Sequence, residues 1–248
     1  CEVLSAFARA GGRVLATGET SLGDERGFAR ADFALGEIFG IVHKGAVEGP
    51  FAMEGRLDFE PATGVFQQVI ASGEVLVRRV ATDPAGSVSG AMDPFPIQST
   101  EWPVAVTQAA GAGRVLYVAF DLGRYYAVHH LVHARDRMAG YIDRLLPERQ
   151  VTVRAPRCLE VTVWRQKTPE RFIIHLANRT PLAHDMPRIH ESPPVRDVEI
   201  ELESPYPTPR VTCRRASAAV TFTGSRIRVH IDKLKVYAAV VIEPAGRE

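Results

Sequence analysis

Acidic residues that directly follow two apolar segments are the first candidates for chemistry in this sequence. Glu19 comes after RVLATG (13–18), and Asp121 comes after RVLYVAF (114–120). Ligands of open α/β sheets bind beyond the carboxyl ends of the strands, so the two carboxylates could form a pair suited to acid–base chemistry. Acidic residues in such turns also cap helices by accepting backbone hydrogen bonds. The sequence alone leaves both roles open.

Two further side chains extend the candidate site. Arg124 and Tyr125 follow Asp121 in the same turn, and together with Glu19 they could line a pocket that recognises a sugar or another polar small molecule. The turn GETSLG (18–23) misses the G-x-S-x-G spacing of a nucleophile elbow by one position. We therefore do not expect a serine hydrolase.

Histidine and cysteine spacing gives little support for a metal or a cofactor. His129 and His133 are spaced i, i+4 on a predicted helix, which a metal could use, but no third ligand or H-E-x-x-H motif accompanies them. Packing or surface exposure is the alternative role. The three cysteines form no C-x-x-C pair; we expect reduced thiols, which favours a cytoplasmic location. No metal and no cofactor is predicted.

Composition excludes several classes of partner. The chain has 248 residues, 30 of them basic and 29 acidic, for a net charge of +1. A dedicated nucleic-acid binder would carry a strong positive field, so nucleic acid is not an expected partner. No apolar run approaches the roughly 20 residues of a membrane-spanning helix, so no membrane partner is expected. At 46% hydrophobic, the chain has the composition of a globular protein.

Helix and strand signals alternate in the first part of the chain, which predicts an α/β unit with a mostly parallel sheet. The pattern predicts an opening helix before Gly11, a strand at 13–18, a short helix at 32–40 capped by Asp32, an irregular stretch at 41–64, a strand at 73–82, a loop at 93–103, a hairpin of 103–108 with 114–123, and a helix at 126–146.

Because apolar residues recur at helical spacing from the first residues on, we expect a piece of a longer protein; a lipid-bearing Cys1 is the alternative.

The periodicity changes to two after LLPERQ (145–150), which marks a domain boundary. Seven short apolar segments follow, at 158–166, 171–178, 195–202, 210–215, 218–224, 226–231 and 236–243, with a Pro-rich insert at 181–194. This spacing predicts an antiparallel β-sandwich. Arginines in these segments, such as Arg214, Arg215, Arg226 and Arg228, alternate with apolar residues as on a solvated sheet face. The predicted domains are 1–148 and 149–248.

Three segments in a fixed order carry a resemblance to a known family: AGGRVLATGETSL followed by DFALGEIFG, then GRVLYVAFDLGRYY, then LEVTVWRQKTPERFIIHLANRT. Nearly the whole chain resembles the region behind the catalytic barrel of bacterial glycoside hydrolases related to the family 42 β-galactosidases. The resemblance implies a partial flavodoxin-like domain, of the class I glutamine amidotransferase-like kind that serves as the β-galactosidase trimerisation domain, and then a small β-sandwich.

The resemblance also implies a function. The chain would be the non-catalytic accessory and oligomerisation half of a glycoside hydrolase acting on a carbohydrate substrate, with an N-terminal barrel of the same protein as its partner and a trimer as its assembly. No catalytic residue is carried over, because the barrel holds the family's catalytic carboxylates, and the ATGETS turn has no counterpart of the amidotransferase cysteine. The alternative is a small-molecule binding module that uses Glu19, Asp121, Arg124 and Tyr125.

Overall fold

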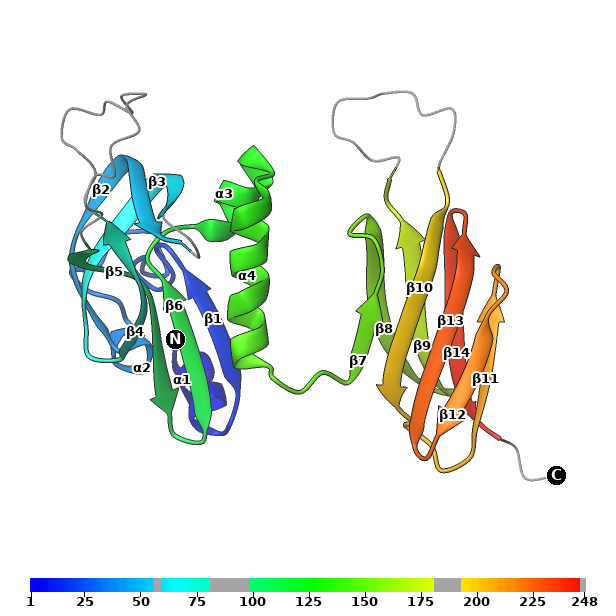
Figure 1. Ribbon diagram of the computed structural model, residues 1–248. Coiled ribbons are helices and arrows are strands. Elements are labelled where there is room, and N and C mark those ends of the chain that lie inside the picture. The colour runs from blue at the N-terminus through cyan, green and yellow to red at the C-terminus, as the bar shows by residue number, and fades with distance from the viewer. Residues whose placement is uncertain (56–58, 81–98, 181–192, 246–248) are drawn as a thin grey trace. The chain divides into compact units, whose positions relative to one another are not determined.

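The protein is divided into two compact units, residues Cys1–Pro147 and Glu148–Glu248. A computed structural model describes residues 1–55, 59–80, 99–180 and 193–245 (Figure 1). Strands make up most of the described chain. Each unit has its own hydrophobic core, so each is described by itself.

The first unit is built on a six-stranded mixed sheet with the strand order β1-β6-β5-β4-β2-β3. Its strands are β1 (Arg13–Thr17), β2 (Ile41–Glu54), β3 (Phe59–Ala71), β4 (Glu74–Val80), β5 (Ser99–Ala110) and β6 (Gly113–Val118). The pair β1 and β6 is parallel, with Arg13 opposite Arg114, and the other pairs are antiparallel. The predicted hairpin is confirmed, since β5 and β6 pair up to Ala110 and Gly113 around a tight turn.

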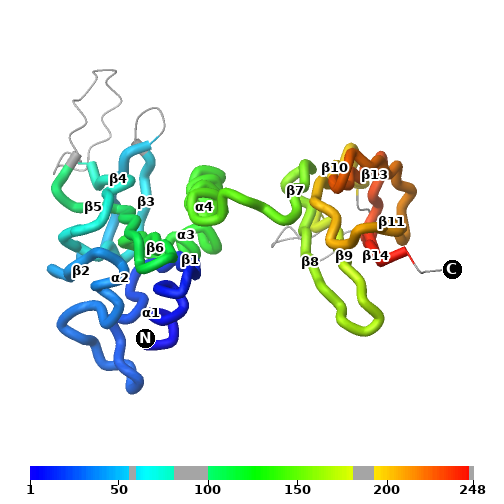
Figure 2. Tube along the Cα trace, turned by 90° about the horizontal axis from the view of Figure 1, so that it is seen from below, coloured from blue at the N-terminus to red at the C-terminus, as the bar shows by residue number. Residues whose placement is uncertain are grey.

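Helices cover the β1–β6 end of this sheet on both sides. They are α1 (Glu2–Arg9), α2 (Gly36–Phe39), α3 (Leu122–His129) and α4 (Val132–Leu145). Figure 2 shows α4 on one side of β1 and β6 and α1 on the other, and both helices contact these strands. The turn after α1 begins at Gly11, whose φ of 107° suits glycine.

Aromatic residues fill the core of the first unit. Phe33 and Phe39 pack against the fully buried Tyr117 of β6. The centroid of the Tyr117 ring lies 5.3 Å from that of Phe33 and 5.5 Å from that of Phe39. Farther along the sheet, Phe51 contacts Phe66 at 5.0 Å and Phe120 at 5.1 Å. These rings tie the helical end of the sheet to the long β2–β3 hairpin.

The structure corrects several sequence predictions for this unit. Among the described residues, the sheet is not mostly parallel. All neighbouring pairs from β6 to β3 are antiparallel, and only β1 and β6 pair in parallel. The described residues of the stretch 41–64 are not irregular but form β2 and the start of β3. Glycines and a bulge after His43 hide the strand pattern.

The third correction concerns the helix predicted at 126–146, which is two helices. His130 adopts a left-handed φ of 52° and ends α3, and Leu131 is extended before α4 begins. The short helix predicted at 32–40 is also narrower than expected. Asp32 does not cap it, since its Oδ1 atom accepts hydrogen bonds from the amides of Phe33 and His43 instead.

The second unit consists of two four-stranded antiparallel sheets around one core. One sheet has the order β12-β13-β10-β7, and the other β11-β14-β9-β8. The strands are β7 (Val151–Arg154), β8 (Leu159–Lys167), β9 (Glu170–Asn178), β10 (Val195–Glu203), β11 (Pro209–Arg214), β12 (Ala219–Thr223), β13 (Arg226–Leu234) and β14 (Tyr237–Pro244).

All seven strands predicted for this unit are present, with β7 as an eighth that the sequence did not indicate. Alternate residues point inward from both sheets and are fully buried, for example Ile174 and Leu176 of β9 and Ile227 and Val229 of β13. Most of the Pro-rich insert at 181–194, and the first part of the loop at 93–103, lie outside the described residues.

Candidate functional site

The turns after β1 and β6 meet at one edge of the first unit's sheet. Gly18 donates its amide proton to the carbonyl of Val118 at 2.9 Å, and the Tyr117 hydroxyl donates to the carbonyl of Gly18 at 2.8 Å. A Cβ atom on Gly18 would lie 3.3 Å from the amide nitrogen of Asp121, so the two turns are in direct contact. The structure thus places Glu19 and Asp121 at the same edge.

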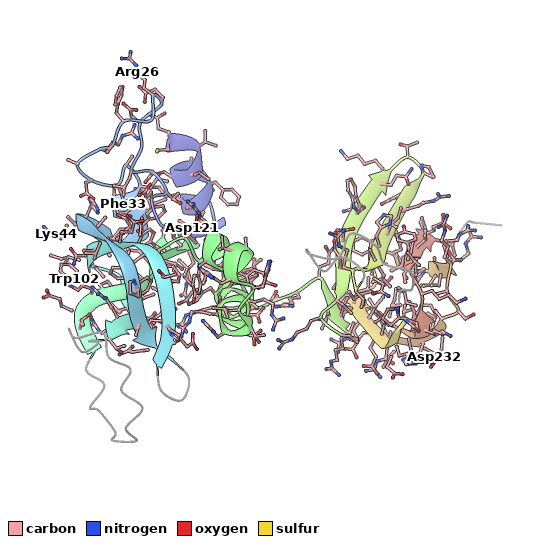
Figure 3. All side chains as sticks on the ribbon, turned by 90° about the horizontal axis from the view of Figure 1, so that it is seen from above. Arg26, Phe33, Lys44, Trp102, Asp121 and Asp232 are labelled. Atoms are coloured by element: carbon pink, nitrogen blue, oxygen red, sulfur yellow. The ribbon has the colours of Figure 1, made fainter. Side chains whose placement is uncertain are left out.

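Asp121 acts as the N-cap of α3. It lies where β6 leads into that helix (Figure 3), and its Oδ1 atom accepts a hydrogen bond from the Arg124 amide at 3.0 Å. One carboxylate oxygen is therefore engaged by the backbone, which is the structural role left open by the sequence. The side chain is exposed, so its other oxygen faces solvent.

Glu19 is exposed and lies close enough to act electrostatically on a buried phenol. Burial raises the pKa of the Tyr117 hydroxyl, and the Glu19 carboxylate raises that pKa further. Tyr117 therefore stays protonated and keeps donating to the Gly18 carbonyl. Glu19 therefore lies within electrostatic range of the Tyr117 hydroxyl at this edge.

The other two predicted pocket residues point in different directions. Arg124 is exposed at the edge, whereas Tyr125 is buried and its hydroxyl donates to the carbonyl of Pro61 at 3.0 Å. Burial raises the pKa of Tyr125. The structure thus brings Glu19, Asp121 and Arg124 to one exposed edge, while Tyr125 joins α3 to β3.

Hydroxyl groups in the turn after β1 also serve the backbone. The Thr20 hydroxyl donates to the carbonyl of Thr17 at 2.7 Å, and Ser21 Oγ accepts from the Leu35 amide at 3.1 Å. Ser21 itself has a left-handed φ of 74°. These bonds fix the turn against the segment that leads into α2.

The two histidines of the predicted i, i+4 pair lie on different helices, because the chain breaks at His130. The prediction that they share one helix face was therefore wrong. Both rings contact Tyr125, with centroids 4.9 Å away for His129 and 6.2 Å for His133. Across the described parts of the chain, no three His, Cys, Asp or Glu side chains are grouped so that they could hold a metal ion.

Cys1 is an exposed free thiol, and Cys158 and Cys213 are half-buried free thiols. Burial raises the pKa of the Cys213 thiol, which disfavours the reactive thiolate. Cys158 and Cys213 contact the core of the second unit. Their arrangement fits residues that pack against the core.

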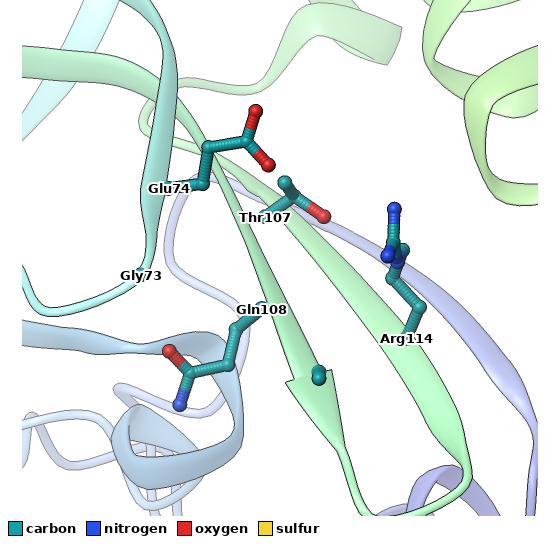
Figure 4. Close-up of a pocket in the computed structure, with 6 residues that line it drawn as sticks. Gly73, Glu74, Thr107, Gln108 and Arg114 are labelled. Atoms are coloured by element: carbon teal, nitrogen blue, oxygen red, sulfur yellow. The ribbon is translucent and has the colours of Figure 1, made fainter.

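A hollow of about 300 Å³ that the sequence did not indicate lies on the β4–β5–β6 part of the sheet (Figure 4). It is lined by Gly73, Glu74, Thr107, Gln108, Ala109 and Arg114. Three of its polar side chains already have partners within the fold: Glu74 pairs with Arg144 at 2.9 Å, the Thr107 hydroxyl donates to the carbonyl of Val115, and the Gln108 amide donates to the carbonyl of Glu37. The hollow therefore lacks a convergent set of free catalytic groups.

Comparison with known proteins was informative only at the level of structure. No family model matches the sequence, and no curated protein matches it. Among solved structures, α-L-fucosidase isoenzyme 2 from Paenibacillus thiaminolyticus matches 99% of the chain with a TM-score of 0.76 and 21% identity. The β-galactosidase from Bacillus circulans sp. alkalophilus matches 98% with a TM-score of 0.58 and 15% identity.

In its fold the chain matches one part of larger glycoside hydrolases. It spans 38% of the fucosidase and 30% of the Bacillus β-galactosidase. A catalytic mutant of Gan42B, a GH42 β-galactosidase from G. stearothermophilus, is similar over 98% of this chain and 29% of its own, with a TM-score of 0.55 and 16% identity. The likeness runs through both units, so it concerns the order of the α/β unit and the sandwich as well as each fold.

Among the described residues, no helix has the length and apolar character needed to cross a membrane.

Proposed function

We propose that this chain is the non-catalytic accessory half of a glycoside hydrolase, with hydrolysis carried out by a barrel elsewhere in the same protein. The observation that carries the proposal is the match to the fucosidase, which extends over 99% of this chain but only 38% of that enzyme. The first unit would be an N-terminally incomplete, flavodoxin-like domain of the glutamine amidotransferase-like kind. The second would be its C-terminal β-sandwich.

The chemistry of the candidate edge supports a non-catalytic role. Glycoside hydrolysis uses two carboxyl groups that flank the scissile bond, one of them a proton donor with a raised pKa. Asp121 is engaged as a helix cap, and Glu19 is an exposed side chain in the turn after β1. Neither carboxylate lies in the hollow lined by Glu74 and Arg114.

The surface of the first unit supports a role in assembly. The α1 side chains Val3, Leu4 and Phe7 are 82%, 44% and 53% exposed, and β1 is an edge strand of the sheet. Exposed apolar helices and open strand edges are features that proteins cover by association. We propose that the barrel of the same protein, and further copies in a trimer, cover these surfaces.

We also propose a cytoplasmic location, which the free thiols support.

The proposal is tested by comparing the native protein with this chain alone on a panel of aryl glycosides that includes β-galactosides and α-L-fucosides. We expect hydrolysis by the native protein and none by recombinant 1–248. As a control for folding, the recombinant chain must show a cooperative thermal transition. Turnover by folded 1–248 at the rate of the native protein would contradict the proposal.

A second candidate function rests on the three exposed polar side chains at the β1–β6 edge. Glu19, Asp121 and Arg124 could bind a small polar ligand such as a sugar, with Tyr125 beneath them. The matched variants are Asp121→Asn, which keeps a capping oxygen, and Arg124→Gln. Sugar affinity, measured by calorimetry, should fall in both variants; affinity unchanged in both would remove this function.

A further inference from the structure

The outer faces of the two sheets of the sandwich differ in composition. On the sheet β12-β13-β10-β7, the outward carboxylates of β10 each pair with an arginine: Glu199 with Arg154 at 3.9 Å, Glu201 with Arg228 at 2.8 Å and Glu203 with Arg226 at 3.2 Å. We call this the paired face. Its charges balance, and these side chains satisfy one another.

The opposite outer face, on the sheet β11-β14-β9-β8, carries an exposed indole. Trp164 of β8 is 64% exposed and lies opposite Ile173 of β9, which in turn lies opposite Val241 of β14. We call this surface the tryptophan face; it consists of the outward side chains of β8, β9, β14 and β11 together with Arg179 and Arg215. The exposed Trp164 ring therefore lies beside a short row of apolar side chains, Ile173 and Val241.

Polar side chains surround Trp164 on the same face. Residues two positions away along a strand, or diagonally across from it, share its face, and at Trp164 these are Thr162, Gln166, Arg171 and His175. The ring of His175 is held by a hydrogen bond between its Nδ1 atom and the Tyr237 hydroxyl. The indole is therefore bordered by hydrogen-bonding groups.

Three arginines of this face have partners within the sandwich. Glu243 is mostly buried, with 14% of its side chain exposed, and it pairs with both Arg171 and Arg210, the latter at 2.7 Å. The Arg215 guanidinium lies 5.8 Å from the centroid of the Tyr237 ring. Side chains that are already ordered lose less entropy when a ligand binds, so these groups are prepared for recognition.

The charges of the tryptophan face do not balance. Five arginines, Arg171, Arg179, Arg210, Arg214 and Arg215, stand against the carboxylates of Glu160 and Glu243. The excess is +3, which exceeds the +1 of the whole chain. Arginine forks bind carboxylate and phosphate groups through two parallel hydrogen bonds, and a sulfate group offers its oxygens in the same way.

We infer that the tryptophan face binds an acidic glycan, with the Trp164 ring stacked on a sugar ring and the surplus arginines holding the carboxylate or sulfate groups of the chain. Charge complementarity selects an acidic over a neutral glycan. The choice of a glycan over single-stranded nucleic acid, which is also bound by aromatic stacking and arginine, rests on the proposed glycoside hydrolase function.

The test uses purified 1–248 in affinity electrophoresis and calorimetry with four probes: polygalacturonate, a sulfated galactan, a neutral galactan and a single-stranded oligonucleotide. We expect binding of the carboxylated polymer, the sulfated polymer or both, weakened by added salt. Trp164→Ala should weaken it about tenfold, given the size of stacking contributions. The double variant Arg214→Gln/Arg215→Gln should weaken it several-fold and reduce its salt dependence.

The sheet β12-β13-β10-β7 supplies the controls. Phe222→Ala removes an aromatic side chain of β12 that is 53% exposed and lies away from the tryptophan face. Arg228→Gln removes a paired arginine of β13. Both should leave affinity within about twofold, as for surface positions outside a binding site. The inference is overturned by no binding to either acidic polymer, by equal binding of neutral galactan, by binding of the oligonucleotide alone, or by full affinity of Trp164→Ala. None of these outcomes depends on whether the native protein is a glycosidase, which the activity comparison decides separately.

Discussion

The two units use their polar side chains in different ways. In the first unit, polar groups bond inward to the backbone of distant elements, as Tyr125 does to Pro61 and Arg137 to Glu54. In the sandwich, the core is formed by apolar residues of both sheets, and charged side chains such as Arg228 and Glu201 pair on its outer surface. A sheet of mixed topology is thus tied together by individual polar contacts, whereas the sandwich relies on its apolar core.

The largest expected effects come from the cores and are the same in kind for both units. Leu116→Ala in the first unit and Ile227→Ala in the second each remove a fully buried side chain, which should lower the free energy of unfolding by about 2 to 5 kcal/mol. Hydrogen exchange measured at increasing denaturant concentration would assign each loss of stability to one unit. A loss spread equally over both units by either variant would show that they unfold as one body and would break the comparison.

Substitutions of polar side chains should destabilise the first unit more than the sandwich. Arg137 donates to Glu60 at 2.8 Å and to the carbonyl of Glu54 at 2.7 Å, with only 11% of its side chain exposed. Arg137→Met leaves Glu60 unpaired and should destabilise the first unit by about 3 kcal/mol. The matched change Arg228→Gln, at a 59% exposed arginine of the sandwich, should have an effect below about 1 kcal/mol. Equal losses in the two variants would contradict the comparison.

The helix cap provides a smaller test. Asp121→Ala removes the acceptor of the Arg124 amide and should lower the stability of the first unit by about 1 kcal/mol, whereas Asp121→Asn should recover most of that loss. Thermal unfolding of the three proteins would measure this order. If the asparagine variant were as unstable as the alanine variant, the charge of Asp121 and not its capping bond would be the stabilising feature.

The smallest effect concerns pH and the sandwich. The hydrogen bond from Arg210, together with the charges of Arg171 and Arg210, lowers the pKa of Glu243 from its usual 4.5. The ionised Glu243 therefore contributes its full stabilisation above the usual pKa of about 4.5, which applies to the unfolded chain. That stabilisation is lost as the pH falls through the lowered pKa of the folded state. Unfolding of wild type and Glu243→Gln from about pH 6 to about pH 3 should show a shallower pH dependence in the variant. Parallel curves would assign the acid sensitivity to other carboxylates.

The sandwich could be predicted from the sequence because its strands alternate with period two between clear turns. The first unit could be predicted only in part. Its β5–β6 hairpin was predicted correctly. The strands β2 and β3 were missed because the glycines at positions 45, 49 and 64 interrupt them, and the partner of β1 is β6, about a hundred residues later in the chain. Local patterns carry no information about such a pairing. The break at His130 was missed for a similar reason, since a single left-handed residue leaves the helical periodicity almost unchanged.

The candidate site shows the same limit. The meeting of the turns after β1 and β6 followed from the strand-end rule, but the inward direction of Tyr125 depends on its contact with Pro61, which no spacing indicates. The tryptophan face did have a sequence signal. In β8, Trp164 falls among the polar residues Glu160, Thr162 and Gln166, in the outward phase of the alternation. A large aromatic residue in that phase indicates a surface role.

The mass of the native polypeptide tests the central claim most directly. Antibodies against 1–248 would identify the protein in its source, and denaturing electrophoresis followed by mass spectrometry would measure it. The account predicts roughly 70 to 95 kDa, which is 27.2 kDa divided by the matched fractions of 38% and 29% and leaves room for a catalytic barrel. A native polypeptide of 27.2 kDa would contradict it.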